Sequence, residues 1–272
     1  MEKVYTLKRF DFYNQLLQII NDGDNTNDIN KVIALYLLEN INNLNNLTIY
    51  DVAEDCYCSR SSVHRFLKQI GFDQFSTLSD YVKDGNLHYH AYYDYVNRDN
   101  FEEYVKSMTI SMMNDISKVS NNEYINKLVD MIHDYKNVYI ITADTSSSAA
   151  KQFQEEMIAT GKIIYVYTSS NTSIESISSL TKEDLVIVCS ITGNYAIACL
   201  DDIREINATK VLVTLNHFDV FRGVFDEVFY MGKEQYRRTH VSYGQRGVYT
   251  KYGLTFFFDI IYHKYAMKYL KK

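Results

Sequence analysis

The sequence predicts an α + α/β chain, in which an N-terminal all-helical domain with a helix-turn-helix precedes an α/β domain built on a parallel sheet. Residues 28–71 have the spacing of three short amphipathic helices, the last two joined by a tight turn. From residue 138 onward, short β-branched runs alternate with helix-length segments, which is typical of βαβ units. The 272 residues are long for one domain and sufficient for two.

Capping residues support the helix-turn-helix prediction. Thr48 has the position of an N-cap for a short helix, with Asp51 as its capping-box partner. Ser59 can cap the next helix, which we expect to end at Gly71, because glycine favours the left-handed stop. The apolar side of that helix is formed by Val63, Phe66, Leu67 and Ile70.

The capped helix after Ser59 is basic, although the chain has a formal net charge of −6. Helical spacing places its arginines and lysine opposite the apolar side, where they can contact phosphates and guanine edges. A solvated helix face is the alternative, and the pattern alone leaves both open. As a DNA-binding surface, the predicted residues are Thr48, Ser59, Arg60, Ser61, Ser62, His64, Arg65 and Lys68.

The second half of the chain supplies the strands of the predicted sheet. Apolar runs at 138–142, 162–168, 184–190 and 209–215, with a weaker one at 227–231, are separated by helical segments, and a closing helix is expected over 247–271. A polar, tyrosine-rich stretch between the two halves is interpreted as a linker. The predicted domains are therefore 1–80 for the helix-turn-helix, 81–100 for the linker and 101–272 for the α/β domain.

Composition and charge narrow the class of protein. Apolar residues make up 46% and charged residues 23%, as in ordinary globular proteins with a sizeable core. The acidic balance excludes non-specific nucleic-acid binding over the whole surface but permits one local basic patch. We find no signal peptide and no run approaching roughly 18 apolar residues, so we expect a cytoplasmic protein with no membrane partner.

The cysteines indicate neither a disulfide framework nor a metal site. Cys56 and Cys58 form a C-x-C pair whose nearest further ligand is His64, and no second Cys/His pair follows at zinc-finger spacing. We expect buried thiols in a reducing compartment, no metal and no cofactor.

The stretch LTIYDVAEDCYCSRSSVHRFLKQIGFDQFSTL resembles the N-terminal DNA-binding domain of RpiR/MurR-type bacterial transcriptional regulators. The positions that carry the resemblance are Ala53, Ser59, Val63, Arg65, Phe66, Gly71, Phe72 and Phe75. That family continues into a sugar isomerase (SIS) domain, and residues 138–270 have the size and element order for one. The resemblance implies a regulator of carbohydrate metabolism that binds double-stranded operator DNA as a homodimer or higher homo-oligomer and senses a phosphorylated sugar.

Two loops are expected to hold an anionic effector, since both offer hydroxyls and backbone amides at a helix start. The candidate ligand-binding residues are Thr145, Ser146, Ser147, Ser190, Thr192, Gly193 and Asn194. This sequence departs from the family's loop pattern at three positions. Thr142 and Asp144 stand where the family has glycines, and Tyr195 replaces a residue with a small hydroxyl. A carboxylate beside a phosphate is unfavourable by on the order of 1 kcal/mol. The ligand therefore differs from the family's usual one, or binding is weakened or lost.

An enzymatic role is not expected. Isomerases of this fold need a positioned base and acid for proton transfer, and the candidates Glu155, Glu156, His133, His217 and His240 lie in no recognisable motif. We therefore predict no catalytic residues. A sugar-phosphate isomerase and a ligand-free SIS dimerisation module remain the alternatives.

Overall fold

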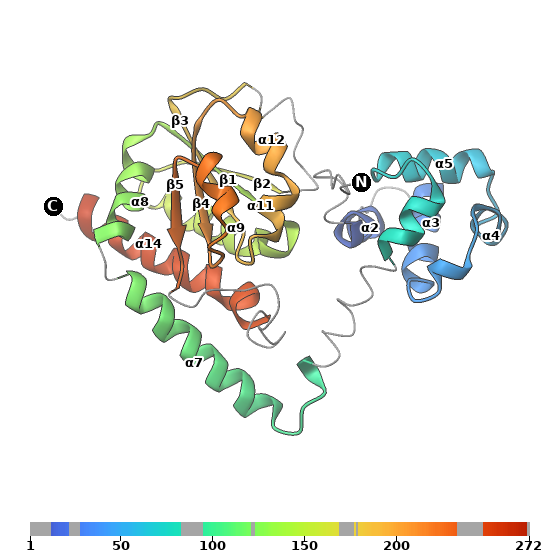
Figure 1. Cartoon of the computed structure of the whole chain (residues 1–272), viewed down its shortest axis with the longest axis horizontal. Coiled ribbons are helices and arrows are strands. Elements are labelled where there is room, and N and C mark those ends of the chain that lie inside the picture. Colours follow the sequence, from blue (N-terminus) through green and yellow to red (C-terminus); the bar gives the residue numbers. More distant parts are fainter. Residues whose placement is uncertain are drawn as a thin grey trace. The chain divides into compact units, whose positions relative to one another are not determined.

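The computed structural model describes residues 12–21, 28–82, 95–120, 123–168, 177, 179–232 and 247–270. The chain divides into two compact units, Met1–Asp94 and Tyr95–Lys272, whose elements are labelled in Figure 1. Most of the predicted linker, residues 83–94, lies outside the described residues, and the predicted domain boundaries stay predictions.

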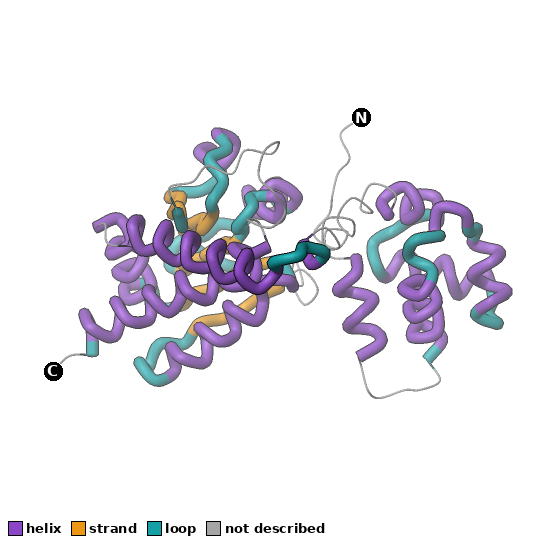
Figure 2. Tube along the Cα trace, turned by 90° about the horizontal axis from the view of Figure 1, so that it is seen from below, coloured by secondary structure: helices purple, strands orange, loops and turns teal. Residues whose placement is uncertain are grey.

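The described part of the N-terminal unit consists of helices joined by turns and short loops (Figures 1 and 2). Its elements are α2 (Phe12–Asn21), α3 (Ile29–Glu39), η1 (Leu44–Asn46), α4 (Ile49–Asp55), α5 (Arg60–Gln69) and a helical segment at 75–82. The turn between α4 and α5 is short, which confirms the predicted helix-turn-helix.

Local sequence explains where these helices begin and end. The Asp28 side chain caps α3, and Thr48 with Asp51 forms the predicted capping box at the start of α4. Ser59 caps α5, and Gly71 adopts a φ of 88° just after it. The predicted caps at Thr48 and Ser59 and the predicted stop at Gly71 are confirmed, whereas the Asp28 cap was not predicted.

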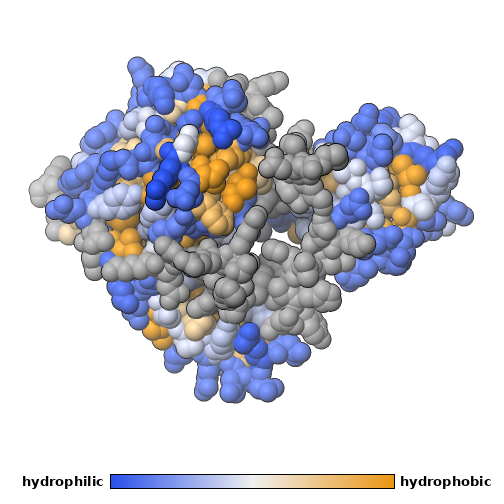
Figure 3. Space-filling view, viewed as in Figure 1, coloured by the Kyte–Doolittle hydropathy of each residue, from blue (hydrophilic) through white to orange (hydrophobic). Residues whose placement is uncertain are grey.

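One apolar core holds the N-terminal unit together. Val63, Phe66 and Leu67 of α5 are buried, as predicted. Phe12 of α2 meets the Phe72 ring edge-on at a centroid distance of 5.5 Å, so α2 packs over the segment that follows α5. On the face seen in Figure 3, hydrophilic side chains predominate on this unit.

The second unit is built on the predicted parallel sheet. Its strands are β1 (Asn137–Thr142), β2 (Ile164–Thr168), β3 (Asp184–Cys189), β4 (Thr209–Thr214) and β5 (Glu227–Tyr230). They lie in the order β2-β1-β3-β4-β5, and every neighbouring pair is parallel. In this order β2 lies on one side of β1, and β3 and the later strands lie on the other side. The connections therefore change direction between β1 and β3, and sheets of this kind bind ligands at such a switch point.

Helices cover the sheet (Figure 1). The helical elements are α7 (Phe101–Ser120), α8 (Glu123–Asp134), η2 (Asp144–Ser146), α9 (Ser147–Ile158), α11 (Asn194–Ala198), α12 (Leu200–Glu205), η3 (Asp219–Gly223), a π-helical turn η4 (Tyr249–Gly253) and α14 (Leu254–Tyr269). Residues of α7, α8, α9 and α14 share one apolar cluster with alternate strand residues such as Ile140, Ile187 and Val211. None of the helices in the described ranges is long and apolar enough to cross a bilayer.

Candidate nucleic-acid interface and effector loops

Helix α5 presents a basic face to solvent. Arg60, Ser61, Arg65 and Lys68 are exposed, and His64 is half-buried at the border of this face. Over residues 28–82 the cations are Lys31, Arg60, Arg65 and Lys68, so three of these four lie on α5. The positive charge of the described N-terminal unit is therefore concentrated on one helix face, as predicted from the sequence.

A groove of about 400 Å³ follows this basic face. Its lining consists of Ile49, Arg60, Ser61, His64, Arg65 and Lys68. Five predicted DNA-binding residues are thus brought together along one groove, and the start of α4 forms its other wall.

The remaining predicted residues, Thr48, Ser59 and Ser62, support the interface from its edges. The Ser59 hydroxyl accepts a hydrogen bond from the Ser62 N–H at 3.1 Å. The Ser62 hydroxyl accepts a long one from the Arg65 guanidinium at 3.5 Å. Ser59 therefore fixes the first turn of α5, and Ser62 lies between that cap and Arg65.

Thr48 is occupied by the capping box of α4. Its hydroxyl accepts from the Tyr50 N–H at 3.2 Å and donates to the Asp51 carboxylate at 2.8 Å. The Asp51 carboxylate also accepts from the Thr48 N–H at 2.7 Å, and these hydrogen bonds hold the pKa of Asp51 below its usual value. The start of α4 is consequently well fixed.

Sequence reasoning missed Tyr50. The Arg60 guanidinium lies over the Tyr50 ring, 4.7 Å from its centroid, and Tyr50 is 61% exposed. Only the folded turn between α4 and α5 brings these two residues together, so no helical spacing could have indicated the contact.

Cys56 and Cys58 lie beside this helix, and neither thiol is fully exposed. Burial raises the pKa of the Cys56 thiol to about 11 and raises that of Cys58 as well. Within the described ranges, no three His, Cys, Asp or Glu side chains are grouped so as to hold a metal ion. Both thiols are therefore protonated at neutral pH, which suits packing better than ligation.

The predicted effector loops lie at the carboxyl ends of β1 and β3. After β1, Thr145 is exposed, whereas Asp144, Ser146 and Ser147 are half-buried. The Ser147 hydroxyl donates to the Asp144 carbonyl at 2.7 Å. Thr142 is fully buried and its hydroxyl donates to the Cys189 carbonyl at 3.1 Å, so this residue ties β1 to β3.

The loop after β3 is held by its own side chains. The Ser190 hydroxyl accepts from the Ala196 N–H at 3.1 Å, and the Thr192 hydroxyl accepts from the Asn194 N–H at 3.4 Å. Gly193 has a φ of 80°, and a Cβ there would lie 2.9 Å from Cβ of Asn216. Only glycine fits this turn, for both conformational and steric reasons.

Asn216 and His217, which follow β4 at the same edge, were not among the predicted ligand-binding residues. The Asn216 amide donates to the Thr192 carbonyl at 2.8 Å and so supports the loop after β3. The His217 ring stacks on Tyr230 at a centroid distance of 3.8 Å. Its Nε2 atom is buried and has no hydrogen-bond partner among the described residues, and burial lowers the pKa of His217.

The structure also gives the positions of Tyr195 and of His133, one of the candidate acids and bases considered from the sequence. Tyr195 is 3% exposed, so the phenol that departs from the family pattern is buried within the unit. Among the histidines, His133 stacks on Tyr269 at 3.6 Å, which joins α8 to α14. His240 lies outside the described residues.

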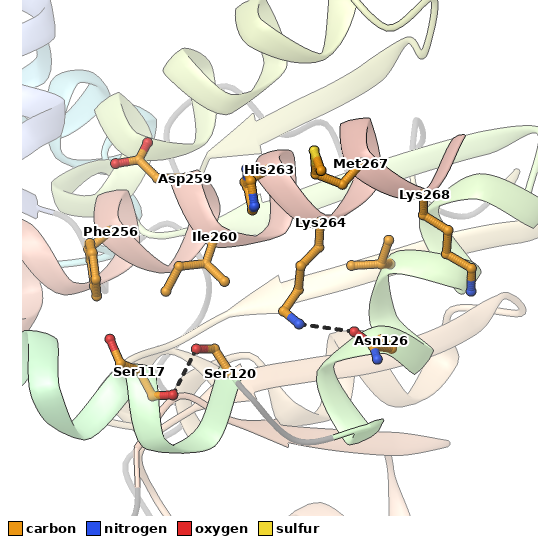
Figure 4. Close-up of a pocket in the computed structure, with 11 residues that line it drawn as sticks. Ser117, Ser120, Asn126, Phe256, Asp259, Ile260, His263, Lys264, Met267 and Lys268 are labelled. Carbon is orange, nitrogen blue, oxygen red and sulfur yellow. Dashed lines mark hydrogen bonds between the residues drawn. The ribbon is translucent and has the colours of Figure 1, made fainter. Parts of the chain in front are cut away.

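A separate groove of about 760 Å³ lies between α14, α7 and α8 (Figure 4). Phe256, Ile260 and Lys264 of α14 point toward it, and the Lys264 ammonium donates to the Asn126 side chain at 3.1 Å. None of the predicted ligand-binding residues lines this groove.

Comparisons with known proteins agree with the fold. Residues 13–84 match the family described as helix-turn-helix domain, rpiR family. Among curated protein sequences, none gives a significant match. Among solved structures, NanR of Vibrio vulnificus, in complex with ManNAc-6P, aligns over 96% of this chain and 93% of its own, with 16% identity and a TM-score of 0.50.

The α/β unit has solved relatives of its own. A putative sugar-phosphate isomerase from Listeria monocytogenes aligns over 65% of this chain and 95% of its own, with 17% identity and a TM-score of 0.50. The sugar isomerase domain of an RpiR transcription factor from Sphaerobacter thermophilus aligns over 61% and 89%, with 16% identity and a TM-score of 0.48.

The fold and the basic groove together define a class of protein in which a helix-turn-helix domain is joined to an SIS-like α/β domain. More specifically, the N-terminal domain is an rpiR-family helix-turn-helix. Over nearly its whole length, the chain shares its fold with NanR of Vibrio vulnificus.

Proposed function

We propose that this chain regulates genes of carbohydrate metabolism by placing α5 in the major groove of operator DNA, under the control of a phosphorylated sugar bound to its SIS-like domain. The basic groove along α5 is the observation that carries the DNA-binding part. In helix-turn-helix proteins the second helix enters the major groove, and its N-terminal residues contact base edges.

The roles of the basic residues follow from their positions. Arg65 and Lys68 are exposed one and two turns into α5 and supply phosphate contacts, which orient the protein on the duplex. Ser61 is small and exposed, so it allows the helix to approach the groove closely. Thr48 and Ser59 keep the starts of α4 and α5 in place through their caps.

Arg65→Ala and Lys68→Ala test this assignment. Each change removes one cation that faces the phosphate backbone, so affinity for the protein's own promoter fragment should fall strongly while the circular dichroism melt stays unchanged. Lys31→Ala is the matched control, because it removes the same charge from α3. Equal affinity of all three variants and the parent would contradict α5 as the interface.

The effector part of the proposal is supported by loop chemistry and by analogy. The loops after β1 and β3 flank the topological switch point and carry hydroxyls and amides suited to a phosphate. NanR was solved with ManNAc-6P, and a related sugar phosphate is the ligand class we propose here. A two-fold symmetric operator would suit a homodimer, whose ligand shifts the balance between two arrangements of the DNA-binding domains.

A thermal-shift panel of sugar phosphates tests the effector. We expect at least one to raise the melting temperature, with inorganic sulfate as the control for non-specific anion effects. Asp144→Gly should strengthen that shift, because it removes a carboxylate at a position where the family has glycine. No shift with any sugar phosphate, in the parent or in the variant, would favour a ligand-free dimerisation module.

Isomerase activity is the second candidate, favoured by the similarity of the α/β unit to a putative sugar-phosphate isomerase. Turnover of ketose phosphates by the purified chain would establish it. We expect no turnover, because the candidate acids and bases lie in no recognisable catalytic motif of the sequence.

A further inference from the structure

We infer that Tyr50 is a positioning residue for Arg60, and that this pair reads a guanine at the edge of the operator half-site. The inference rests on the proposed DNA-binding function and assigns different roles to the basic side chains of α5. Arg60 specifies sequence, whereas Arg65 and Lys68 anchor the phosphate backbone.

Both members of the pair stand on fixed backbone. The Tyr50 N–H donates to the Thr48 hydroxyl at 3.2 Å within the capping box of α4. Arg60 is the first residue of α5 and directly follows the Ser59 cap. The 4.7 Å stack therefore joins two helix starts that local hydrogen bonds already hold.

Stacking orients the guanidinium without using up its donors. A cation–π contact occupies the face of the planar group, and the N–H bonds point outward in its plane. Among the described residues, no carboxylate pairs with Arg60. The guanidinium thus lies over the Tyr50 ring with its N–H donors available for a bidentate acceptor.

A bidentate acceptor of this kind exists in the major groove. Arginine bound to O6 and N7 of guanine is the commonest specific contact there, and the N-terminal residues of a recognition helix are the ones that reach base edges. Holding the fork in place before binding reduces the entropy lost on complex formation. Lysine, a point charge without the planar fork, cannot reproduce this geometry.

Arg65 and Lys68 differ from Arg60 in this respect. Among the described residues, the Arg65 guanidinium has only the long 3.5 Å hydrogen bond to Ser62, and Lys68 carries a compact ammonium at the far end of α5. Neither is held by an aromatic face among the described residues. Flexible cations suit phosphates, whose positions do not depend on sequence.

The test compares a selected duplex with a scrambled one. The full-length chain first enriches a duplex from a random library, and affinities are then measured over a series of salt concentrations. Arg60→Lys should weaken binding to the selected duplex by roughly five- to a hundredfold, with little effect on the scrambled duplex. The salt dependence should stay unchanged, because the charge is kept.

The Tyr50 variants test the positioning role. Tyr50→Ala should lower affinity for the selected duplex about two- to fivefold, whereas Tyr50→Phe, which keeps the ring, should behave as the parent does. In the Arg60→Lys background, Tyr50→Ala should have little further effect, since the fork it positions is gone.

Each negative result of these experiments would overturn a different part of the proposal. An unchanged ratio of selected to scrambled affinity in Arg60→Lys would make Arg60 a phosphate contact and overturn the inference. An equal loss of affinity from Tyr50→Ala in both backgrounds would overturn the positioning role. If the parent enriches no duplex at all, the proposed DNA-binding function fails, and the inference falls with it.

Discussion

Tyr57 occupies a backbone conformation that suits glycine better. It closes α4 with a φ of 49°, is 97% exposed, and lies in a turn where the Cys58 N–H donates to the Ala53 carbonyl at 2.9 Å. The left-handed region costs an L-residue about 1–2 kcal/mol. The turn is accordingly formed at some cost in stability, two residues before the Ser59 cap of α5.

Tyr57→Gly should therefore stabilise the N-terminal unit by about 1 kcal/mol, since an exposed ring contributes no packing. Urea denaturation followed by circular dichroism measures the change. Tyr57→Ala keeps the Cβ and serves as the control, with no comparable gain expected. A destabilised glycine variant would show that the ring contributes to the fold.

His217 should make stability depend on pH. Burial lowers its pKa in the folded chain, so the unfolded chain binds the proton more readily. Stability is then retained above the unfolded pKa of about 6.5 and is lost as pH falls below it. His217→Phe keeps a ring on Tyr230 and should remove this part of the pH dependence of the melting temperature.

The exposed His263 provides a matched control for that experiment. His263→Gln removes an exposed histidine from the same unit, and an equal change of the pH profile in both variants would contradict the assignment to His217. An unchanged pH profile in His217→Phe would mean that His217 gains a proton in the folded chain as easily as in the unfolded one.

At the scale of single residues, the sequence predicted those features that depend only on residues close by in the chain. The caps at Thr48 and Ser59 and the stop at Gly71 follow from the preferences of a few adjacent positions. The stack of Arg60 on Tyr50 and the support of Gly193 by Asn216 depend on turns and strand order, which no local pattern encodes.

At the scale of elements, a side chain of strand β4, Lys210, caps the C-terminal end of helix α12. Its side chain is buried within β4, on the opposite sheet face from the neighbouring Val211. Its ammonium donates to the Ile203 and Arg204 carbonyls at 3.3 and 3.2 Å, at the end of α12. A cation is favourable at a helix C-terminus, where carbonyls lack intrahelical partners.

Lys210→Met should consequently destabilise the α/β unit by about 1–3 kcal/mol, because it removes the donor from the buried Ile203 carbonyl and the half-buried Arg204 carbonyl. Chemical denaturation provides the measurement. Lys182→Met is the control: its ammonium donates to a single carbonyl, that of Ala208, from an exposed position. Equal effects of the two substitutions would argue against the capping role of Lys210.

Elements were predictable where periodicity was strong. Every predicted strand is present, because buried parallel strands read as continuous apolar runs. The helical segment expected between the third and fourth strands is instead divided at Cys199 into α11 and α12. The closing helix begins with a π-helical turn at Tyr249–Gly253, a local widening that apolar spacing does not reveal.

At the scale of the whole molecule, a basic helix in an acidic chain is best explained by a local DNA interface. The acidic remainder limits non-specific attraction to nucleic acid, while the groove along α5 retains a cationic surface. The family resemblance extended this interpretation to the α/β domain, whereas the identity of the effector depends on loop details that distinguish this chain from its relatives.

The most direct test of the central claim is the salt dependence of duplex binding in Arg65→Ala/Lys68→Ala. If α5 docks on DNA through these side chains, the slope of log K against log salt should become shallower by about 0.9 for each phosphate that the variant no longer neutralises. A slope equal to that of the parent would show that the duplex is bound by another surface, and would contradict the account.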